Sequence, residues 1–111
     1  MRTLRFIVDK QIIRPDPECD FSNLVPGSEQ YLQAEFSFSP EWDGFVKVAA
    51  FYSRLGKEYE PQIIKNGKSC VIPAEALDKK IFKVQIRGMH LGTSQKLITN
   101  KLVVHQNGGE S

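Results

Sequence analysis

Alternation between apolar and polar positions is the dominant pattern along this chain. Between residues 32 and 38 the even positions are apolar and the odd positions are polar, and residues 82–87 repeat this order. Successive side chains of a β-strand point to opposite faces, so a period of two predicts strands with one buried face. Shorter runs at residues 4–8 and 98–104 predict the first and last strands.

The next apolar segment, from residue 46 to residue 51, alternates less cleanly. Val46, Val48 and Ala50 are apolar. The positions between them include Ala49, and Phe51 follows, and both are apolar as well. A strand that is buried on both faces, or partly covered by a partner, has this pattern.

Two short segments predict tight turns between strands. Asn66-Gly67 separates two apolar runs, and a two-residue type I′ turn needs a positive φ at both positions, which Asn and Gly adopt readily. Residues 54–57 predict a second hairpin, which joins a strand at 46–52 to one at 58–64. Pro61 has no N–H group to donate, so the latter strand is expected at a sheet edge or with a bulge.

Irregular segments and one helical turn complete the expected fold. Two glycines predict a loop over residues 88–95, prolines predict an irregular segment at 14–30, and residues 106–111 are expected to form a flexible tail. Proline at the start of residues 73–77 predicts a short helical turn. About seven strands at these spacings predict an all-β fold, an antiparallel β-sandwich of the immunoglobulin-like type. We expect a single domain over residues 1–111.

Composition and charge narrow the class of protein. Of the 111 residues, 41% are hydrophobic and 25% are charged, as in an ordinary globular domain, and no apolar run is long enough to span a membrane. Charges within the first apolar run predict a strand there rather than a signal peptide. Residues 1–60 carry 7 basic and 10 acidic side chains, and residues 61–111 carry 8 and 3. Either these charges are scattered by chance, or they form two surfaces of opposite sign suited to stacking or to a charged partner.

The two cysteines, Cys19 and Cys70, do not predict a disulfide-rich protein. They are far apart in the sequence and form no CxxC pair. Two cysteines cannot make a disulfide framework, which favours a protein of the virion or of the host cytoplasm over a secreted scaffold. Cys70 stands in an apolar run and is expected to be a small buried residue.

Residue types that catalyse reactions or bind metals are present, but not in the spacing that such sites need. His90, His105 and the two cysteines are scattered, whereas structural zinc sites usually draw their ligands from close pairs. Glu41 and Asp43 flank Trp42 in a segment that is typical of a solvated turn. No nucleotide-binding glycine loop and no serine-nucleophile motif is present. We therefore expect no catalytic residue, no metal and no cofactor, and a function other than catalysis.

Nucleic acid is not favoured as a partner either. The basic residues that would line one face of a strand are Lys79, Lys80, Lys83 and Arg87. The apolar residues of that strand alternate with them and point inward, whereas single-strand binders present aromatic and basic groups on the same surface. A formal net charge of +2 adds little attraction for a polyanion.

Apolar residues in predicted turns point to a protein partner. Leu55 lies in the turn of the second hairpin, and Met89 and Leu91 lie in the glycine-containing loop, next to Arg87 and His90. Apolar side chains at loop tips often contact a partner, although they can also fold back onto the end of the core. The candidate partner-binding residues are Leu55, Arg87, Met89, His90 and Leu91.

One segment resembles the signature of a known family. Residues 36–51 read FSFSPEWDGFVKVAAF, and they are similar to the FSFSxEWDG segment, followed by a lysine and an apolar strand, of a small β-sandwich at the N-terminus of phage baseplate upper proteins and related tail-fibre proteins. Residues 69–77, 82–88 and 97–104 are similar, in the same order, to the family's C-x-V-P-W-E-V-L, F-x-V-x-V-x-G and L-x-T-N stretches. One departure is Ala74, where the family tends to have tryptophan.

The EWDG segment also has a physical interpretation as a structural corner. Trp42 is the only tryptophan and follows a strand whose even positions point inward, so it can close one end of the core. Gly44 allows the chain to turn sharply, and the carboxylate of Asp43 can accept hydrogen bonds from backbone amides in the turn.

The resemblance implies a baseplate- or tail-associated bacteriophage protein that works by protein–protein recognition. In the family this domain usually begins a longer chain, whereas the present sequence ends at Ser111. Two hypotheses therefore stay open. The first is a non-enzymatic phage structural or accessory protein that binds another virion component and forms a homo-oligomer. The second is a small phage-encoded inhibitor that binds a host defence protein.

Overall fold

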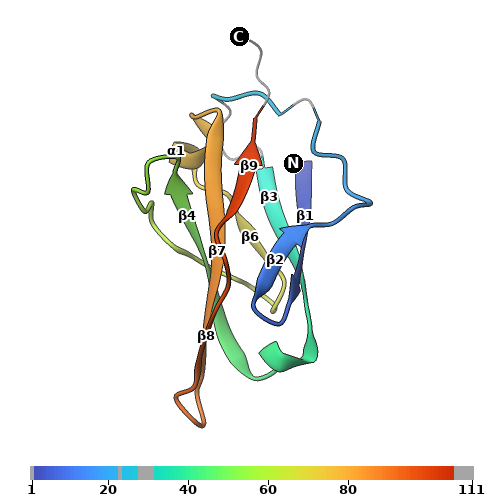
Figure 1. Ribbon diagram of the computed structural model, residues 1–111, viewed down its shortest axis with the longest axis vertical. Coiled ribbons are helices and arrows are strands. Elements are labelled where there is room, and N and C mark those ends of the chain that lie inside the picture. Colours follow the sequence, from blue (N-terminus) through green and yellow to red (C-terminus); the bar gives the residue numbers. More distant parts are fainter. Residues whose placement is uncertain (1, 23, 28–31, 107–111) are drawn as a thin grey trace.

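A computed structural model describes residues 2–22, 24–27 and 32–106 of the chain as two layers of β-strands (Figure 1). The strands, in chain order, are β1 (Arg2–Asp9), β2 (Ile12–Pro15), β3 (Leu32–Phe38), β4 (Phe45–Ser53), β5 (Gln62–Ile63), β6 (Ser69–Val71), β7 (Ile81–His90), β8 (Lys96–Ile98) and β9 (Leu102–His105). A 3₁₀ turn, η1 (Pro40–Trp42), precedes β4, and a single helical turn, α1 (Ala74–Leu77), precedes β7. The predicted helical turn is confirmed, with Pro73 immediately before it.

The first sheet has the order β2-β1-β3-β6 and mixes two strand directions. β1 pairs with β2 antiparallel but with β3 parallel, in the register Phe6 to Phe36. The reason lies in the connection. A tight turn places β2 along one edge of β1. After the long connection that follows β2, β3 lies along the other edge of β1 and runs in the same direction as β1. The expectation of a two-layered β fold is confirmed, whereas the expectation of a wholly antiparallel sandwich is wrong.

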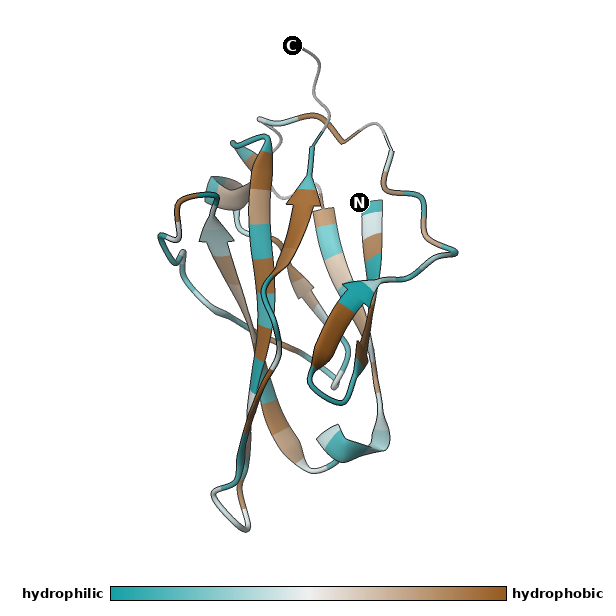
Figure 2. Cartoon of the chain, viewed as in Figure 1, coloured by the Kyte–Doolittle hydropathy of each residue, from teal (hydrophilic) through white to brown (hydrophobic). Residues whose placement is uncertain are grey.

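The second sheet has the order β5-β4-β7-β8, and β9 also pairs with β7. β4 pairs with β7 along its whole length, from Phe45 opposite His90 to Ser53 opposite Phe82. β8 and β9 follow one another along the other edge of β7, so β7 is central. Figure 2 shows brown and teal bands alternating along β7, as a period-two strand requires.

The core lies between the two sheets, and β1, β3 and β7 supply to it the alternating positions that the sequence predicts, whereas β4 supplies Phe45, Ala49 and Phe51. Phe6 and Phe36 stack with their ring centroids 5.4 Å apart, and Phe51 lies 6.1 Å from Phe82. In β4, Ala49 and Ala50 are both buried although they point to opposite faces. The irregular apolar pattern of this strand therefore reflects partial burial of its outward face.

Asn66 and Gly67 form the predicted turn, but not the predicted hairpin. Both have positive φ, at 53° and 69°, and the N–H of Lys68 donates to the carbonyl of Lys65 over 3.0 Å. The strands on either side separate at once, because β5 belongs to the second sheet and β6 to the first. Only Lys65 and Ser69 pair across the turn. This turn carries the chain from one sheet to the other.

The turn at residues 54–57 is present as predicted. Gly56 has φ +101°, and the N–H of Ser53 donates to the carbonyl of Lys57 over 2.8 Å. Tyr52 pairs with Glu58, and after Pro61 the chain forms the two-residue strand β5 at the edge of the sheet. The edge position that proline predicts is confirmed.

Three predicted boundaries need correction. The loop expected at 88–95 is shorter, because β7 continues to His90 and β8 begins at Lys96. The irregular segment expected at 14–30 begins inside β2, and its residues 23 and 28–31 lie outside the described residues. Of the expected tail, Gln106 is buried and its side chain donates to the carbonyls of Leu77 and Lys79, while residues 107–111 lie outside the described residues.

The two thiols are expected to differ in reactivity. Cys70 is buried, as predicted, and burial raises its pKa to about 12, so the thiol stays almost wholly protonated at pH 8.5. Cys19 is half-buried and lines a surface hollow, and both cysteines are free. With a chromogenic disulfide reagent, one equivalent should react rapidly and a second only on unfolding. Two rapid equivalents would contradict the structure, and Cys19→Ser should remove the rapid one.

The raised pKa of Cys70 also sets a dependence of stability on pH. The unfolded thiol ionises near pH 9 and the folded thiol near pH 12. Because the folded state keeps the thiol neutral, its contribution to stability is complete below pH 9 and declines as the pH rises towards 12.

Candidate protein interface

Trp42 closes one end of the sandwich. Its side chain is buried, and its indole N–H donates to the carbonyl of Lys10 over 2.7 Å. The ring packs against Phe38 and Phe45, with centroids 5.6 and 5.9 Å away. Gly44 follows with φ +81°, a conformation that glycine adopts without strain. This corner therefore fixes the connection between β3 and β4.

The two carboxylates beside Trp42 lie on the surface. Within the described residues the side chain of Asp43 makes no hydrogen bond, contrary to expectation, and its backbone N–H instead donates to the carbonyl of Pro40 over 3.0 Å. Glu41 is exposed, and a hydrogen bond from the hydroxyl of Ser39 lowers its pKa. Backbone geometry thus closes this turn.

His90 belongs to the same end of the core. Its ring lies 5.3 Å from that of Phe45, edge to face, and its Nδ1 accepts a hydrogen bond from the N–H of Gly92 over 3.2 Å. A Cβ on Gly44 would lie 3.0 Å from Nε2 of His90. The structure therefore separates His90 from the other candidate partner-binding residues and places it against the corner.

The outward face of the second sheet carries a group of exposed apolar side chains. Val48 lies beside Ile63 on one side and Arg87 on the other. Arg87 in turn lies beside Ile98. We define the apolar patch as Val46, Val48, Ile63, Met89, Leu91 and Ile98. All of these are exposed or half-buried, with Ile63 66% and Leu91 77% exposed. Apolar side chains gathered on one face are typical of a protein-binding surface.

A groove runs along this patch where the β7–β8 hairpin projects from the end of the molecule opposite α1 (Figure 1). It has a volume of about 400 Å³. Its lining is apolar except for two cationic residues, Arg87 and Lys96. We call it the arm groove, after the projecting hairpin.

The middle of the same face is polar and held by hydrogen bonds. The hydroxyl of Tyr52 donates to Gln85 over 2.7 Å, and Gln85 donates to the carbonyl of Thr99 over 2.8 Å. The guanidinium of Arg87 donates a hydrogen bond to the hydroxyl oxygen of Tyr52. It also donates to both carboxylate oxygens of Glu58, over 2.8 and 3.3 Å. The hydrogen bond with Glu58 raises the pKa of Arg87. Arg87 is therefore fixed in place as a cation on this face.

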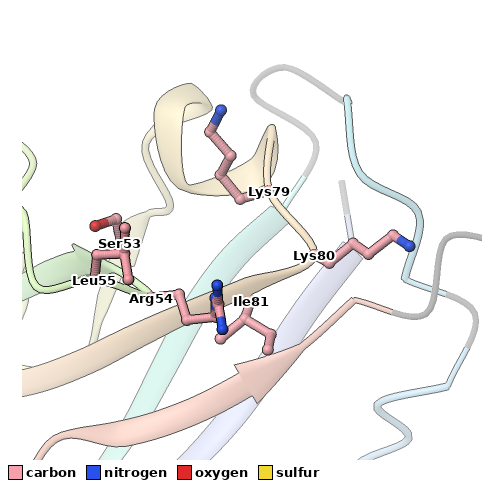
Figure 3. Close-up of a pocket in the computed structure, with 6 residues that line it drawn as sticks. All are labelled: Ser53, Arg54, Leu55, Lys79, Lys80 and Ile81. Atoms are coloured by element: carbon pink, nitrogen blue, oxygen red, sulfur yellow. The ribbon is translucent and has the colours of Figure 1, made fainter.

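A second hollow lies between the turn that follows β4, at residues 54–57, and the start of β7 (Figure 3). It has a volume of about 450 Å³. Leu55, which is 88% exposed, and Arg54 lie on the β4 side, and Lys79 and Lys80 come from the segment between α1 and β7. Ser53 and Ile81 complete the lining. We call it the basic hollow.

The sequence-predicted residues thus fall into three places. Arg87, Met89 and Leu91 line the arm groove, Leu55 lines the basic hollow, and His90 packs at the corner. The sequence interpretation did not single out Ile63 or Ile98, because each stands in a short strand with no clear period. A signal existed for Val46 and Val48, since the mixed pattern of β4 is what a partner-covered strand shows.

Among the described residues, no three His, Cys, Asp and Glu side chains gather closely enough to hold a metal ion. None of the helices in this described part of the chain has the length and apolar character needed to cross a bilayer.

No protein-family model, curated protein or solved structure matches this chain. The residues and the geometry of the chain are therefore the basis for assigning its function.

Proposed function

We propose that this chain is a non-enzymatic structural or accessory protein of a bacteriophage, and that it works by recognising another protein component of the virion. The observation that carries the recognition role is the apolar patch, which leaves β-branched and other apolar side chains of β4, β5, β7 and β8 in solvent. Exposure of such side chains is costly in water, and covering them by a partner would stabilise a complex. The phage setting rests on the resemblance of residues 36–51, and the immunoglobulin-like type of sandwich rests on the number and spacing of the strands that the sequence predicts.

Arg87 supports the choice of this face. Interfaces are enriched in Arg, Tyr and Met, and a few such residues supply most of the binding energy. Here Arg87 is held by Glu58 and Tyr52 beside the apolar patch. A side chain that is already ordered loses less entropy on binding than a mobile one.

Association with virions tests this proposal. Labelled antibody should mark purified phage particles in negative-stain images, and the Met89→Ser/Leu91→Ser double variant should bind particles that lack the protein at least about tenfold more weakly than the unaltered chain. The matched control is Ile12→Ser/Val71→Ser, which changes two exposed apolar residues of the first sheet and should bind normally.

Three results would contradict the proposal. Absence of the label from every particle would remove the structural role. Specific binding to a host defence enzyme, lost in the same Met89→Ser/Leu91→Ser variant, would favour the inhibitor hypothesis. Equal loss in both double variants would show that the patch is not the recognition surface.

A further inference from the structure

The arm groove and the basic hollow lie at the two ends of one row of side chains. Alternation places Ile81, Lys83, Gln85, Arg87 and Met89 on the outward face of β7, because the residues between them point into the core. Ile81 lines the basic hollow, and Arg87 and Met89 line the arm groove. At about 3.3 Å per residue, Ile81 and Met89 are separated by about 26 Å along the strand.

The surface between the two hollows is cationic. Lys101 lies over the ring of Tyr52, with its Nζ 4.2 Å from the centroid, and Arg87 lies over the same ring. Lys83 stands on the outward row between them and the basic hollow, and Lys96 stands beside Met89. Among the described residues, the one ion pair on this face joins Arg87 to Glu58.

These charges argue against a second copy as the occupant. Face-to-face pairing of two such surfaces would bring lysines close to lysines, and like charges across an interface oppose binding. A partner that carries carboxylates would instead gain attraction along the whole row. Each hollow can accommodate an apolar side chain of the partner. Leu55 and Ile81 line the basic hollow, and Val46, Met89 and Leu91 line the arm groove.

We propose that this face binds an extended acidic segment of the partner protein, laid along β7, with one apolar side chain in each hollow and carboxylates between them. A nine-residue extended segment spans about the required 26 Å. This inference rests on the proposed function and names the chemistry of the partner. Lys83 and Lys101 contact the acidic middle, and Arg87, fixed by Glu58, lies at its arm-groove end.

A designed peptide tests the proposal on the whole chain. The probe is Leu-Glu-Asp-Glu-Ser-Glu-Asp-Glu-Leu, added to isotope-labelled protein while amide resonances are recorded. We expect shifts around both Leu55 and Met89, and binding that weakens as salt is raised because the attraction is electrostatic. A probe with serine at both ends should bind at least about tenfold more weakly, as loss of two apolar anchors requires.

Charge reversal separates the row from the rest of the surface. The Lys83→Glu/Lys101→Glu variant should bind the unaltered probe at least about tenfold more weakly. The control variant Arg14→Glu/Lys68→Glu has the same change of net charge, on exposed residues elsewhere, and should bind the probe almost as the unaltered chain does. The same spectra report whether each variant is folded.

Three outcomes would overturn the proposal. These are no shifts at millimolar probe, shifts at one hollow alone, or shifts on dilution of the protein by itself that show Met89 covered by a second copy. This test can fail or succeed independently of the virion assay. The protein could bind the probe and yet be absent from particles, or be present in particles and not bind the probe.

Discussion

Replacement of Trp42 by alanine is expected to lower the free energy of unfolding by about 4 kcal/mol. The change removes the largest fully buried side chain, together with its contacts to Phe38 and Phe45. It also leaves the carbonyl of Lys10 without the indole N–H that donates to it over 2.7 Å. A cavity at the end of the core cannot close without moving β3 or β4.

Urea unfolding followed by far-ultraviolet circular dichroism measures this effect, since Trp42 is the only tryptophan and fluorescence would be lost with it. Trp42→Phe is the matched variant. It keeps an aromatic ring in the site and loses the hydrogen bond, so it should cost about 2 kcal/mol. A loss below about 1 kcal/mol for the alanine variant would show that the corner is not part of the cooperative core.

Addition of a single methyl group at Gly88 is expected to destabilise the protein by about 2 kcal/mol. A Cβ there would lie 2.9 and 3.2 Å from two ring carbons of Trp42 and 3.3 Å from Phe45. Both rings are packed within the core, so neither can move aside cheaply. Gly92→Ala is the matched control. Its Cβ would meet the ring of His90 at 3.3 Å in an exposed turn, and it should cost less than about 0.5 kcal/mol.

Combining the two changes gives a direct check of the contact. If the new methyl group clashes with the ring of Trp42, the loss of unfolding free energy caused by Gly88→Ala should fall to near zero in the Trp42→Ala background. This corresponds to a coupling of about 2 kcal/mol between the two sites. Additive costs would show instead that the methyl group disturbs the strand itself.

Gly88 also shows why parts of the fold could not be predicted from the sequence. A glycine near a second glycine favours a loop, but Gly88 lies inside β7 and is small because the ring of Trp42 occupies the space beside it. That contact joins residues 46 positions apart, and no local pattern contains it. The parallel pairing of β1 with β3 was missed for the same reason, since alternation fixes which face of a strand is buried but not its neighbour or its direction.

The candidate interface was partly predictable for a related reason. Leu55 and Leu91 stand in turns, where an exposed apolar residue is conspicuous in the sequence. Ile63 and Ile98 were missed because their exposure depends on which strands β4 and β7 lie beside. The loop expected from residue 88 begins only after His90, because β7 continues to that residue. As the last residue of β7 on the inward side, it packs against Phe45.

The central position of β1 has a consequence for how the chain acquires its structure. β1 precedes the other described strands in the chain, yet its parallel neighbour β3 is separated from it by the whole connection that contains β2. β4 likewise pairs with β7, which follows much later in the chain. Ordering a long intervening segment before such distant pairs form carries an entropic cost that slows the search for them. The β1–β2 hairpin can form early on a nascent chain, because its two strands are neighbours in the sequence. The rest of the molecule then completes in milliseconds to seconds, roughly the range of sandwiches built from non-local pairs.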